Sequence, residues 1–322
     1  STDLEVSVKH IASALVESEG ETVVPGKYFL EIVKSLRDAA VCCEVEDTLF
    51  KVICMDSEFK LNTLNPADFP AFPEMQVDTS ATISLGALST MVKQVSKAVS
   101  RDETRAVLTG IFFMIEEDTL RMVATDSYRL AISEQKMETP ISEKFEVIVP
   151  GQIFDEVIRL ASGFKDIKIG YTQNQVVFIF GTSTIITRKI EGNYPNYQQI
   201  IPKEKVVSMV VDTQGLISAI KRASILVQDN SPLTFSIDSD AQLLTIFSFS
   251  QEIGAVEDKI PVQITGESLQ IGFNYKYILD GLQTVHAEQI VFEAQAPLKP
   301  GIFKTTDDEH FFYLTMPVRL SR

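Results

Sequence analysis

The chain has 322 residues, of which 45% are hydrophobic and 9% aromatic, so it can bury large apolar cores and is long enough for two or three domains. It carries 29 basic and 44 acidic residues, and this net charge of −15 argues against a protein that grips nucleic acid over its whole surface. No run of about 18 apolar residues could span a membrane, and the first ten residues lack a signal-peptide pattern. We therefore expect a cytoplasmic protein.

The three cysteines, Cys42, Cys43 and Cys54, lie in one apolar stretch that has the composition of β-strands. Their spacing does not match a zinc site, and the three histidines are distant from one another in the sequence, at 10, 286 and 310. We predict buried thiols, and we expect no metal and no other cofactor.

One amphipathic segment occurs three times, as "VVPGKYFLEIVKSL" at 23–36, "IVPGQIFDEVIRLA" at 148–161 and "GFNYKYILDGLQTV" at 272–285. In the first copy the apolar residues Phe29, Ile32, Val33 and Leu36 have the spacing of one helix face. Pro25 and Gly26 mark the start of that helix. The matching stripe in the other two copies predicts the same helix about every 125 residues, and its acidic position recurs as Glu31, Glu156 and Asp280.

A second predicted helix also repeats, at 84–101 and again at 212–225, and Lys93 of the first copy corresponds to Lys221 of the second. The loop sequences "DFP" at 68–70 and "NYP" at 193–195 keep the same offset. A period of this length indicates duplicated domains, because the repeats of solenoid proteins are about 20 to 50 residues long.

Between the helices the chain alternates apolar and polar residues around turns, as in "GIFFMIEEDTLRMVATDSYRLAISEQ" at 110–135, which predicts hairpins. The expected fold is α+β, with three tandem domains at 1–77, 78–204 and 205–322, each with two helices on antiparallel sheets. "TDLEVSV" at 2–8 resembles "TDSYRLAI" at 125–132. The first domain is therefore expected to lack its first helix and strand, about 45 residues, either in the material or in the gene product.

The segments "VATDSYRLA", "NYPNYQQIIP" and "YLTMPVRL", in this order and spacing, resemble the bacterial DNA polymerase III beta subunit family, the sliding clamps. The resemblance runs along the whole chain. It implies a head-to-tail homodimeric ring of six similar domains, whose helices line a hole that encircles duplex DNA. It also implies a non-catalytic processivity factor that tethers the DNA polymerase III alpha subunit, the clamp loader and other proteins with a clamp-binding motif. The holoenzyme it serves carries 3'-5' exonuclease activity.

Basic residues on the predicted helices resolve the conflict between an acidic chain and a DNA partner. Segment 84–101 contains three basic residues and no acidic one, and Lys93, Lys97 and Arg101 follow each other at intervals of four, on one helix face. For a single helix this pattern would indicate only a solvated face. Given the repeats and the resemblance, we expect the hole to be lined by Lys27, Lys93, Lys97, Arg101, Arg105, Lys221 and Lys276.

The resemblance also implies a groove, between the second and third domains, that accepts a short peptide with apolar anchors. Carried over by position, the groove residues are Leu108, Thr125, Tyr128, Arg129, Leu130, Pro195, Ile200, Leu314, Met316, Pro317, Val318 and Arg319. Leu108, Leu130 and Leu314 would otherwise be interpreted as core residues. Ser127 stands where many members have Gly, and Gln199 where some have Arg, so peptide preference is expected to differ.

Ring closure is expected to bring the first domain of one chain against the third domain of the other. The predicted contacts are Leu36, Phe59, Leu61, Ile225 and Leu226, each of which could equally be an interior residue.

Two other functions compete with a clamp. An enzyme would need a nucleophile paired with a base, or a glycine-rich phosphate loop, and the sequence contains no such motif. A protein-only scaffold of duplicated domains would not need basic residues concentrated on helix faces.

Overall fold

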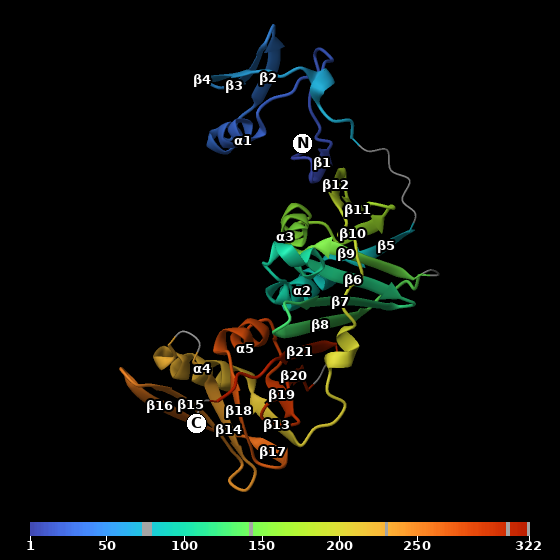
Figure 1. The fold of residues 1–322 in the computed structure, drawn as a ribbon. Helices are drawn as coiled ribbons and strands as arrows, with labels where there is room; N and C mark the ends of the chain where they lie inside the picture. Colours follow the sequence, from blue (N-terminus) through green and yellow to red (C-terminus); the bar gives the residue numbers. More distant parts are fainter. Residues whose placement is uncertain (73–78, 142–143, 229–230, 307–309, 321–322) are drawn as a thin grey trace. The chain divides into compact units, whose positions relative to one another are not determined.

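The computed structural model describes residues 1–72, 79–141, 144–228, 231–306 and 310–320 (Figure 1). The chain forms two compact units. Unit 1 contains Ser1–Gln76 and Ile179–Thr187, and unit 2 contains Val77–Phe178 and Arg188–Arg322. The proposed boundary between residues 77 and 78 lies outside the described residues.

Unit 1 contains a three-stranded antiparallel sheet of β2 (Val41–Glu46), β3 (Leu49–Cys54) and β4 (Ser57–Asn62), in the order β2-β3-β4. Helix α1 (Gly26–Ser35) contacts this sheet through Phe29, whose ring meets Phe50 edge-on at 5.5 Å between centroids. A short 3-10 helix, η1 (Pro66–Asp68), follows. Elsewhere in unit 1, β1 (Val6–His10) pairs antiparallel with β12 (Ser183–Arg188).

The prediction of three buried thiols is wrong for two of the cysteines. Cys54 on β3 is buried, but Cys42 and Cys43 are exposed. Strand β2, which carries them, is at an edge of its sheet, and every residue of β2 is exposed. Neighbouring residues of a strand face opposite sides. The exposure of both cysteines therefore means that β2 is uncovered on its two faces.

Unit 2 contains three groups of antiparallel strands. β10 (Asp166–Tyr171) pairs with β5 (Thr79–Ser84) and, on its other side, neighbours β11 (Gln175–Phe180). A four-stranded sheet has the order β16 (Gly254–Pro261), β15 (Leu243–Ser250), β14 (Leu233–Asp238) and β18 (Leu269–Phe273). A nine-stranded sheet has the order β17 (Gln263–Gly266), β13 (Val207–Asp212), β19 (Gln289–Ala294), β20 (Gly301–Thr305), β21 (Phe311–Thr315), β8 (Arg129–Lys136), β7 (Thr119–Thr125), β6 (Gly110–Glu116) and β9 (Phe145–Pro150).

Strands from the second and third proposed domains meet in the nine-stranded sheet, where β8 pairs with β21 (Figure 1). The register sets Leu130 opposite Leu314 and Arg129 opposite Thr315. This pairing joins residues about 180 positions apart in the sequence, and it places the turn before β8 beside the end of β21.

The four α-helices in the described part of unit 2 pack in pairs, α2 (Leu85–Val95) with α3 (Gly151–Leu160) and α4 (Thr213–Ala223) with α5 (Tyr275–Leu282). The predicted apolar stripe is buried in both later copies of the repeated helix, as at Phe154 and Val157 of α3 and at Ile278 and Leu282 of α5. The prediction of repeated helices on antiparallel sheets is confirmed.

The first copy of that helix differs in its packing. None of the residues of α1 is buried, and Val33 is 47% exposed. The later copies each contact a second helix, whereas α1 is the only α-helix in the described residues of unit 1. The same sequence pattern thus forms the same helix, but burial depends on whether a partner element covers it.

The predicted helix at 84–101 is too long. Helix α2 ends at Val95, and a 3-10 turn, η2 (Ser96–Ala98), follows it. Beyond this turn the Ser100 amide donates to the Leu108 carbonyl at 2.9 Å, and the Ser100 hydroxyl accepts the Asp102 amide at 3.1 Å. These bonds draw the chain away from the helix axis. Arg101 therefore does not continue the helix face that carries Lys93.

Candidate partner-binding site and basic surface

The centre of the candidate site is a turn over Thr125–Arg129, between β7 and β8. The Asp126 carboxylate accepts the amides of Tyr128 at 2.9 Å and Arg129 at 3.0 Å, and the Thr125 hydroxyl donates to the Arg129 carbonyl at 2.7 Å. Ser127 has a φ of 78°, in the left-handed region that favours glycine. The turn points Tyr128 to solvent, where it is 58% exposed.

The Arg129 side chain turns inward and connects the turn to helix α5. Its Nε is 2.9 Å from Asp126, its Nη1 is 2.5 Å from Asp280 of α5, and its guanidinium lies over the Tyr277 ring, 4.5 Å from the centroid. Burial alone would lower the pKa of Arg129, but Tyr313, Asp280 and Asp126 outweigh it, and the pKa is raised. Arg129 is therefore a fixed cation that joins the second and third proposed domains.

Three residues of this cluster, Tyr277, Asp280 and Tyr313, are absent from the sequence-based set. The Tyr313 hydroxyl donates to the Tyr277 carbonyl at 2.7 Å, and burial raises the pKa of Tyr313. The Tyr277 ring also stacks against Tyr128, with 6.2 Å between centroids. Asp280 did leave a signal, since it is the acidic position of the repeated helix. Its partner Arg129 lies 151 residues away and could not be recognised from that pattern.

The apolar part of the predicted groove combines buried and exposed residues. Leu130 and Leu314 are 0% and 1% exposed, in a cluster with Val123 and Tyr197, so they match the interpretation as core residues and could form only the floor of a groove. Ile200 is 46% exposed and Met316 39% exposed. A backbone hydrogen bond joins the turn to the segment after β21, since the Met316 amide donates to the Tyr128 carbonyl at 2.8 Å.

The other predicted groove residues lie around this centre or away from it. Thr125 forms part of the turn, Pro195 is exposed just before the 3-10 helix η4 (Tyr197–Ile200), and Gln199 is exposed on η4. Leu108 is buried in the 3-10 segment η3 (Glu103–Thr109).

The end of the described chain leaves the turn. Pro317 is half-buried, Arg319 is exposed, and Val318 pairs with Gly272 at the end of β18. Val318 lines a separate hollow of about 320 Å³ with Asn274 and Lys276. The structure therefore brings most of the predicted groove residues of β8 and β21 together, while Val318 belongs to the β18 side of unit 2.

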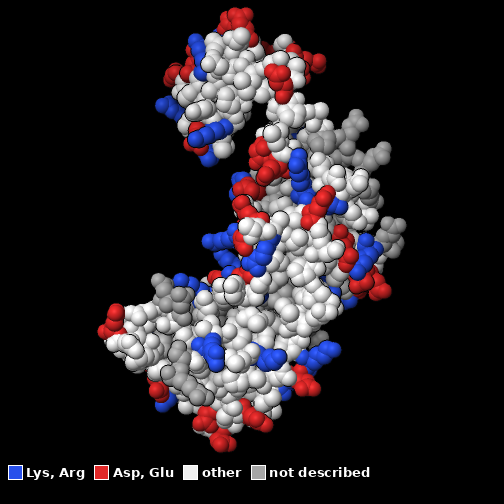
Figure 2. Space-filling view, viewed as in Figure 1, with Lys and Arg blue, Asp and Glu red and all other residues white. Residues whose placement is uncertain are grey.

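The seven predicted DNA-facing residues are all exposed. Lys93 and Lys97 lie on α2 and η2, Lys221 on α4, and Lys276 on α5, where no salt bridge to any of them is found in the described part of the chain. Lys27 lies on α1 in unit 1. Figure 2 shows basic side chains projecting over α2, on the side of unit 2 that carries its helices.

Arg105 differs from the other six basic residues. Its Nε is 3.0 Å from Asp102, and its Nη1 donates to the Ser127 hydroxyl at 2.9 Å. It therefore contacts the Thr125–Arg129 turn and shares its charge with a neighbouring carboxylate.

The predicted dimer residues are distributed over both units. Phe59 and Leu61 share one face of β4 and are half-buried, and Leu36 is half-buried directly after α1. Ile225 is 75% exposed and Leu226 half-buried in the 3-10 helix η5 (Ser224–Leu226).

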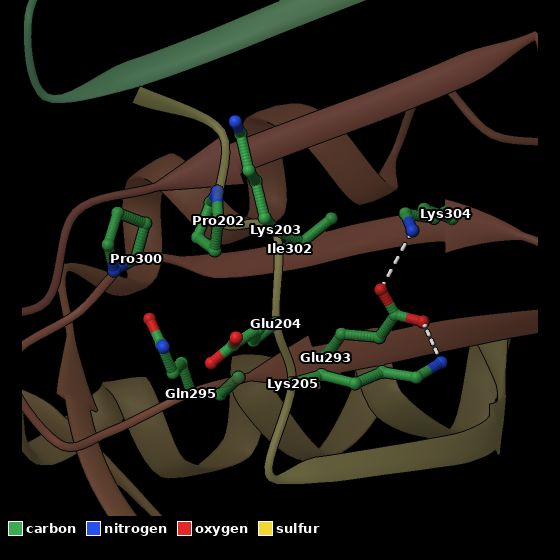
Figure 3. A pocket seen from close by; sticks show the side chains of 10 residues that line it. Pro202, Lys203, Glu204, Lys205, Glu293, Gln295, Pro300, Ile302 and Lys304 are labelled. Carbon is green, nitrogen blue, oxygen red and sulfur yellow. Dashed lines mark hydrogen bonds and ion pairs between the residues drawn. The ribbon is translucent and has the colours of Figure 1, made fainter. Parts of the chain in front are cut away.

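A second hollow, of about 230 Å³, lies between the segment Pro202–Lys205 and strands β19 and β20 (Figure 3). Glu293 is among its lining residues, and the Glu293 carboxylate bridges Lys205 at 2.6 Å and Lys304 at 2.7 Å. Burial would raise the pKa of Glu293, but the two lysines prevail and lower it. Through Lys205, these ion pairs hold the segment before β13 against the sheet. None of the predicted groove residues lines this hollow.

No group of three or more metal-ligating side chains that could hold a metal ion is present among the residues that the structure describes. In the same residues, no helix is long and apolar enough to cross a membrane.

Three tandem regions of helices and antiparallel sheets, a cross-domain β8–β21 pairing and exposed lysines on the helices define a clamp-like architecture. The family models of the DNA polymerase III beta subunit match in order: the N-terminal domain at residues 1–73, the central domain at 82–196 and the C-terminal domain at 198–319. The chain belongs to the DNA polymerase III beta subunit family, the bacterial sliding clamps.

Individual relatives agree with this membership. The beta sliding clamp of Staphylococcus epidermidis is 31% identical, over 99% of this chain and 87% of that protein. The sliding clamp of Bacillus subtilis has a TM-score of 0.93 at 31% identity, and a clamp of Pseudomonas aeruginosa bound to griselimycin has 0.93 at 28%. Each alignment covers 99% of this chain and 87% of the other.

Proposed function

We propose that two copies of this chain close head to tail into a ring around duplex DNA and hold replication proteins on it. The observation that carries the proposal is the repeated placement of exposed lysines on equivalent helices, Lys93 on α2 and Lys221 on α4. Lysines without acidic partners attract phosphates without reading bases, so the contact permits movement along DNA. The DNA-facing set remains Lys27, Lys93, Lys97, Arg101, Arg105, Lys221 and Lys276, with Arg105 the weakest member.

The ring proposal uses the domain boundaries 1–77, 78–204 and 205–322. Its closing contact is between Leu36, Phe59 and Leu61 of one copy and Ile225 and Leu226 of the other. The exposure of Ile225, at 75%, supports a contact that a second copy would cover. Such a protein is a non-catalytic cytoplasmic subunit of the replication machinery, and its partners are the DNA polymerase III alpha subunit, the clamp loader and other proteins with a clamp-binding motif.

DNA retention tests the ring. A Lys93→Gln, Lys97→Gln, Arg101→Gln triple variant should leave nicked circular DNA several-fold faster than the wild type at low salt, since the charge contacts are lost. The matched control changes Lys168, Lys189 and Lys299 to Gln, which removes three lysines from strands and loops. Equal retention of the two variants would reject the DNA-facing set. A protein-only scaffold would show no difference between circular and linear templates, whereas a ring slides off linear ends.

We also propose that the surface around the Thr125–Arg129 turn, Leu130 and Met316 binds the apolar anchors of a partner peptide. The exposure of Met316, which has an adaptable side chain, and of Ile200, together with the buried Leu130 and Leu314, supports this site. A Met316→Ala, Leu130→Ala double variant should bind a five-residue peptide with Leu and Phe anchors at least tenfold more weakly. Unchanged affinity would reject the site. Circular dichroism and a Met91→Ala, Leu88→Ala control report whether core truncation alone causes the loss.

A further inference from the structure

A hollow of about 820 Å³ lies in unit 2, apart from the turn and from the Glu293 ion pair. Its walls are strands β6, β7 and β9, the 173–174 turn between β10 and β11, and the segment 189–198 that leads toward β13. No predicted groove residue except Pro195 lines it.

Aromatic rings form the inner wall of this hollow, and amides form its rim. Phe112 and Tyr194 stack with 5.1 Å between centroids, and the Tyr194 hydroxyl donates to the Val123 carbonyl at 3.3 Å, so the rings are held in place. Five carboxamide side chains line the hollow, and all are exposed: Gln173, Asn174, Asn193, Asn196 and Gln198. A carboxamide both donates and accepts, as does a peptide main chain.

The charges around the hollow cancel. Arg121 pairs with Glu134, and Lys144 lies 2.7 Å from Glu146 and 4.0 Å from Glu116. The lining residues include three acidic side chains and three basic ones, counting Glu191 and Lys189. A hollow of this kind does not favour a phosphate or a strongly charged segment. It fits an uncharged extended chain that stacks on the rings and exchanges hydrogen bonds with the amides.

The hollow and the proposed peptide site share a wall. Tyr197 lines the hollow and is buried in the same apolar cluster as Leu130 and Leu314. Phe112 and Tyr194 pack against that cluster from the side of the hollow. Exposed Pro195 belongs to the predicted groove and to the hollow. A chain whose anchors occupy the groove can therefore continue past Pro195 into the hollow.

We propose that this hollow binds the uncharged residues that flank the apolar anchors of a partner segment, as an extended chain. The inference rests on the proposed peptide site and extends it. The groove supplies anchoring, and the hollow distinguishes partners by the sequence next to their anchors, since a strongly charged flank would have to lose its hydration where the lining carries no net opposite charge.

Peptide titration by fluorescence anisotropy tests the inference. The probes are a five-residue peptide with Leu and Phe anchors and two longer versions, with six Ser and Asn residues added at the amino or at the carboxyl end. One of the two extensions should raise affinity roughly three- to tenfold, the range of one or two net hydrogen bonds. A Gln173→Ala, Asn174→Ala variant should lose most of this gain and bind the short peptide like the wild type. Gln214→Ala, an exposed amide on α4, is the matched control.

The outcomes separate the inference from the proposed function. If the short peptide binds and neither extension changes affinity, the hollow is not a flank site and the groove proposal stands. An equal gain in the wild type and in the Gln173→Ala, Asn174→Ala variant also overturns the hollow as the binding place. If no peptide binds, both proposals are rejected. Shifts of the amide signals of residues 173–174, 193–194 and 196–198 that occur with only one of the two long peptides would support the inference.

Discussion

The turns at Thr2–Val6 in unit 1 and Thr125–Arg129 in unit 2 are two copies of one structure. In each, the threonine hydroxyl accepts the amide two residues later, and the aspartate accepts the next two amides. The third residue has nearly the same φ, 77° at Leu4 and 78° at Ser127. Each turn leads into a strand that pairs antiparallel, with Val6 opposite Thr187 of β12 and Arg129 opposite Thr315 of β21.

The main difference between the two copies lies in the side chains that follow the aspartate. In unit 1 the residues after the aspartate are Leu4, Glu5 and Val6, and the position that corresponds to Arg129 is a half-buried valine, Val6. In unit 2, Arg129 at the same position binds Asp126 and Asp280. The Thr-Asp pair therefore sets the backbone of the turn, whereas the residues that follow it decide whether the turn becomes a binding site.

The largest expected difference between the copies follows from removing Arg129. Arg129→Met leaves the Asp126 and Asp280 carboxylates without their cation, and we expect a loss of about 2–3 kcal/mol in the free energy of unfolding together with weaker peptide binding. The matched Val6→Met change should cost less than about 1 kcal/mol. Denaturant unfolding measures both. Equal losses would mean that the Arg129 cluster adds no stability to the shared turn.

The next largest difference between the two turns is expected when their aspartates, Asp126 and Asp3, are replaced. Asp126→Ala should cost about 2–3 kcal/mol, because it removes two backbone hydrogen bonds and the bond to Arg129, while Asp3→Ala removes only the backbone bonds of an exposed turn and should cost about 0.5–1 kcal/mol. Hydrogen exchange of the Tyr128 and Arg129 amides, compared with the Glu5 and Val6 amides, locates each loss. Faster exchange outside the mutated turn would contradict a local role.

The exposed copy also gives a pH prediction. The amides of Val6 and Glu5 lower the pKa of Asp3 below 3.8. A carboxylate with a lowered pKa stabilises the folded state above its unfolded pKa, and this contribution is lost as the pH falls through the folded pKa. The NMR signals of the Glu5 and Val6 amides should therefore shift at a lower pH than an ordinary aspartate would titrate. In Asp3→Ala this transition should disappear, and its persistence would assign it to another group.

The smallest changes in stability are expected at the residue with left-handed φ in each turn, Leu4 and Ser127. Leu4→Gly should stabilise unit 1 by about 0.5–1 kcal/mol, because relief of the strained φ exceeds the entropy cost of glycine. Ser127→Gly relieves the same strain but loses the bond from Arg105, so its net effect should be about zero. Thermal unfolding of both variants checks this. If Ser127→Gly stabilises as much as Leu4→Gly, the Arg105 bond contributes nothing.

Local patterns in the sequence were sufficient for the repeated elements. The spacing of Phe154, Val157 and Ala161 predicted a helix with one buried face, and all three are buried. The alternation at 110–135 predicted the hairpins of β6, β7 and β8. The likeness of 2–8 to 125–132 marked two copies of one segment, and both copies form the same turn, because its hydrogen bonds join residues no more than a few positions apart.

Three sequence-based predictions were wrong or incomplete, each at a place where contacts between distant residues determine burial or the end of a helix. The same helical stripe is at most half-buried in α1, because no second helix covers it in the described part of unit 1. Cys42 and Cys43 are exposed on an edge strand. Arg101 lies beyond the end of α2 because Ser100 bonds to Leu108. Such outcomes depend on which elements pack together, and the periodic pattern of one segment does not indicate its packing partners.

The sequence by itself determined the family and the tandem organisation, since the repeated spacing can be recognised directly from the residues. Only the tertiary structure decided that Arg129 meets Asp280 and that Leu130 faces Leu314, because the β8–β21 pairing brings together residues about 180 positions apart. The same pairing makes one copy of the turn a candidate binding site and leaves the other a plain connection.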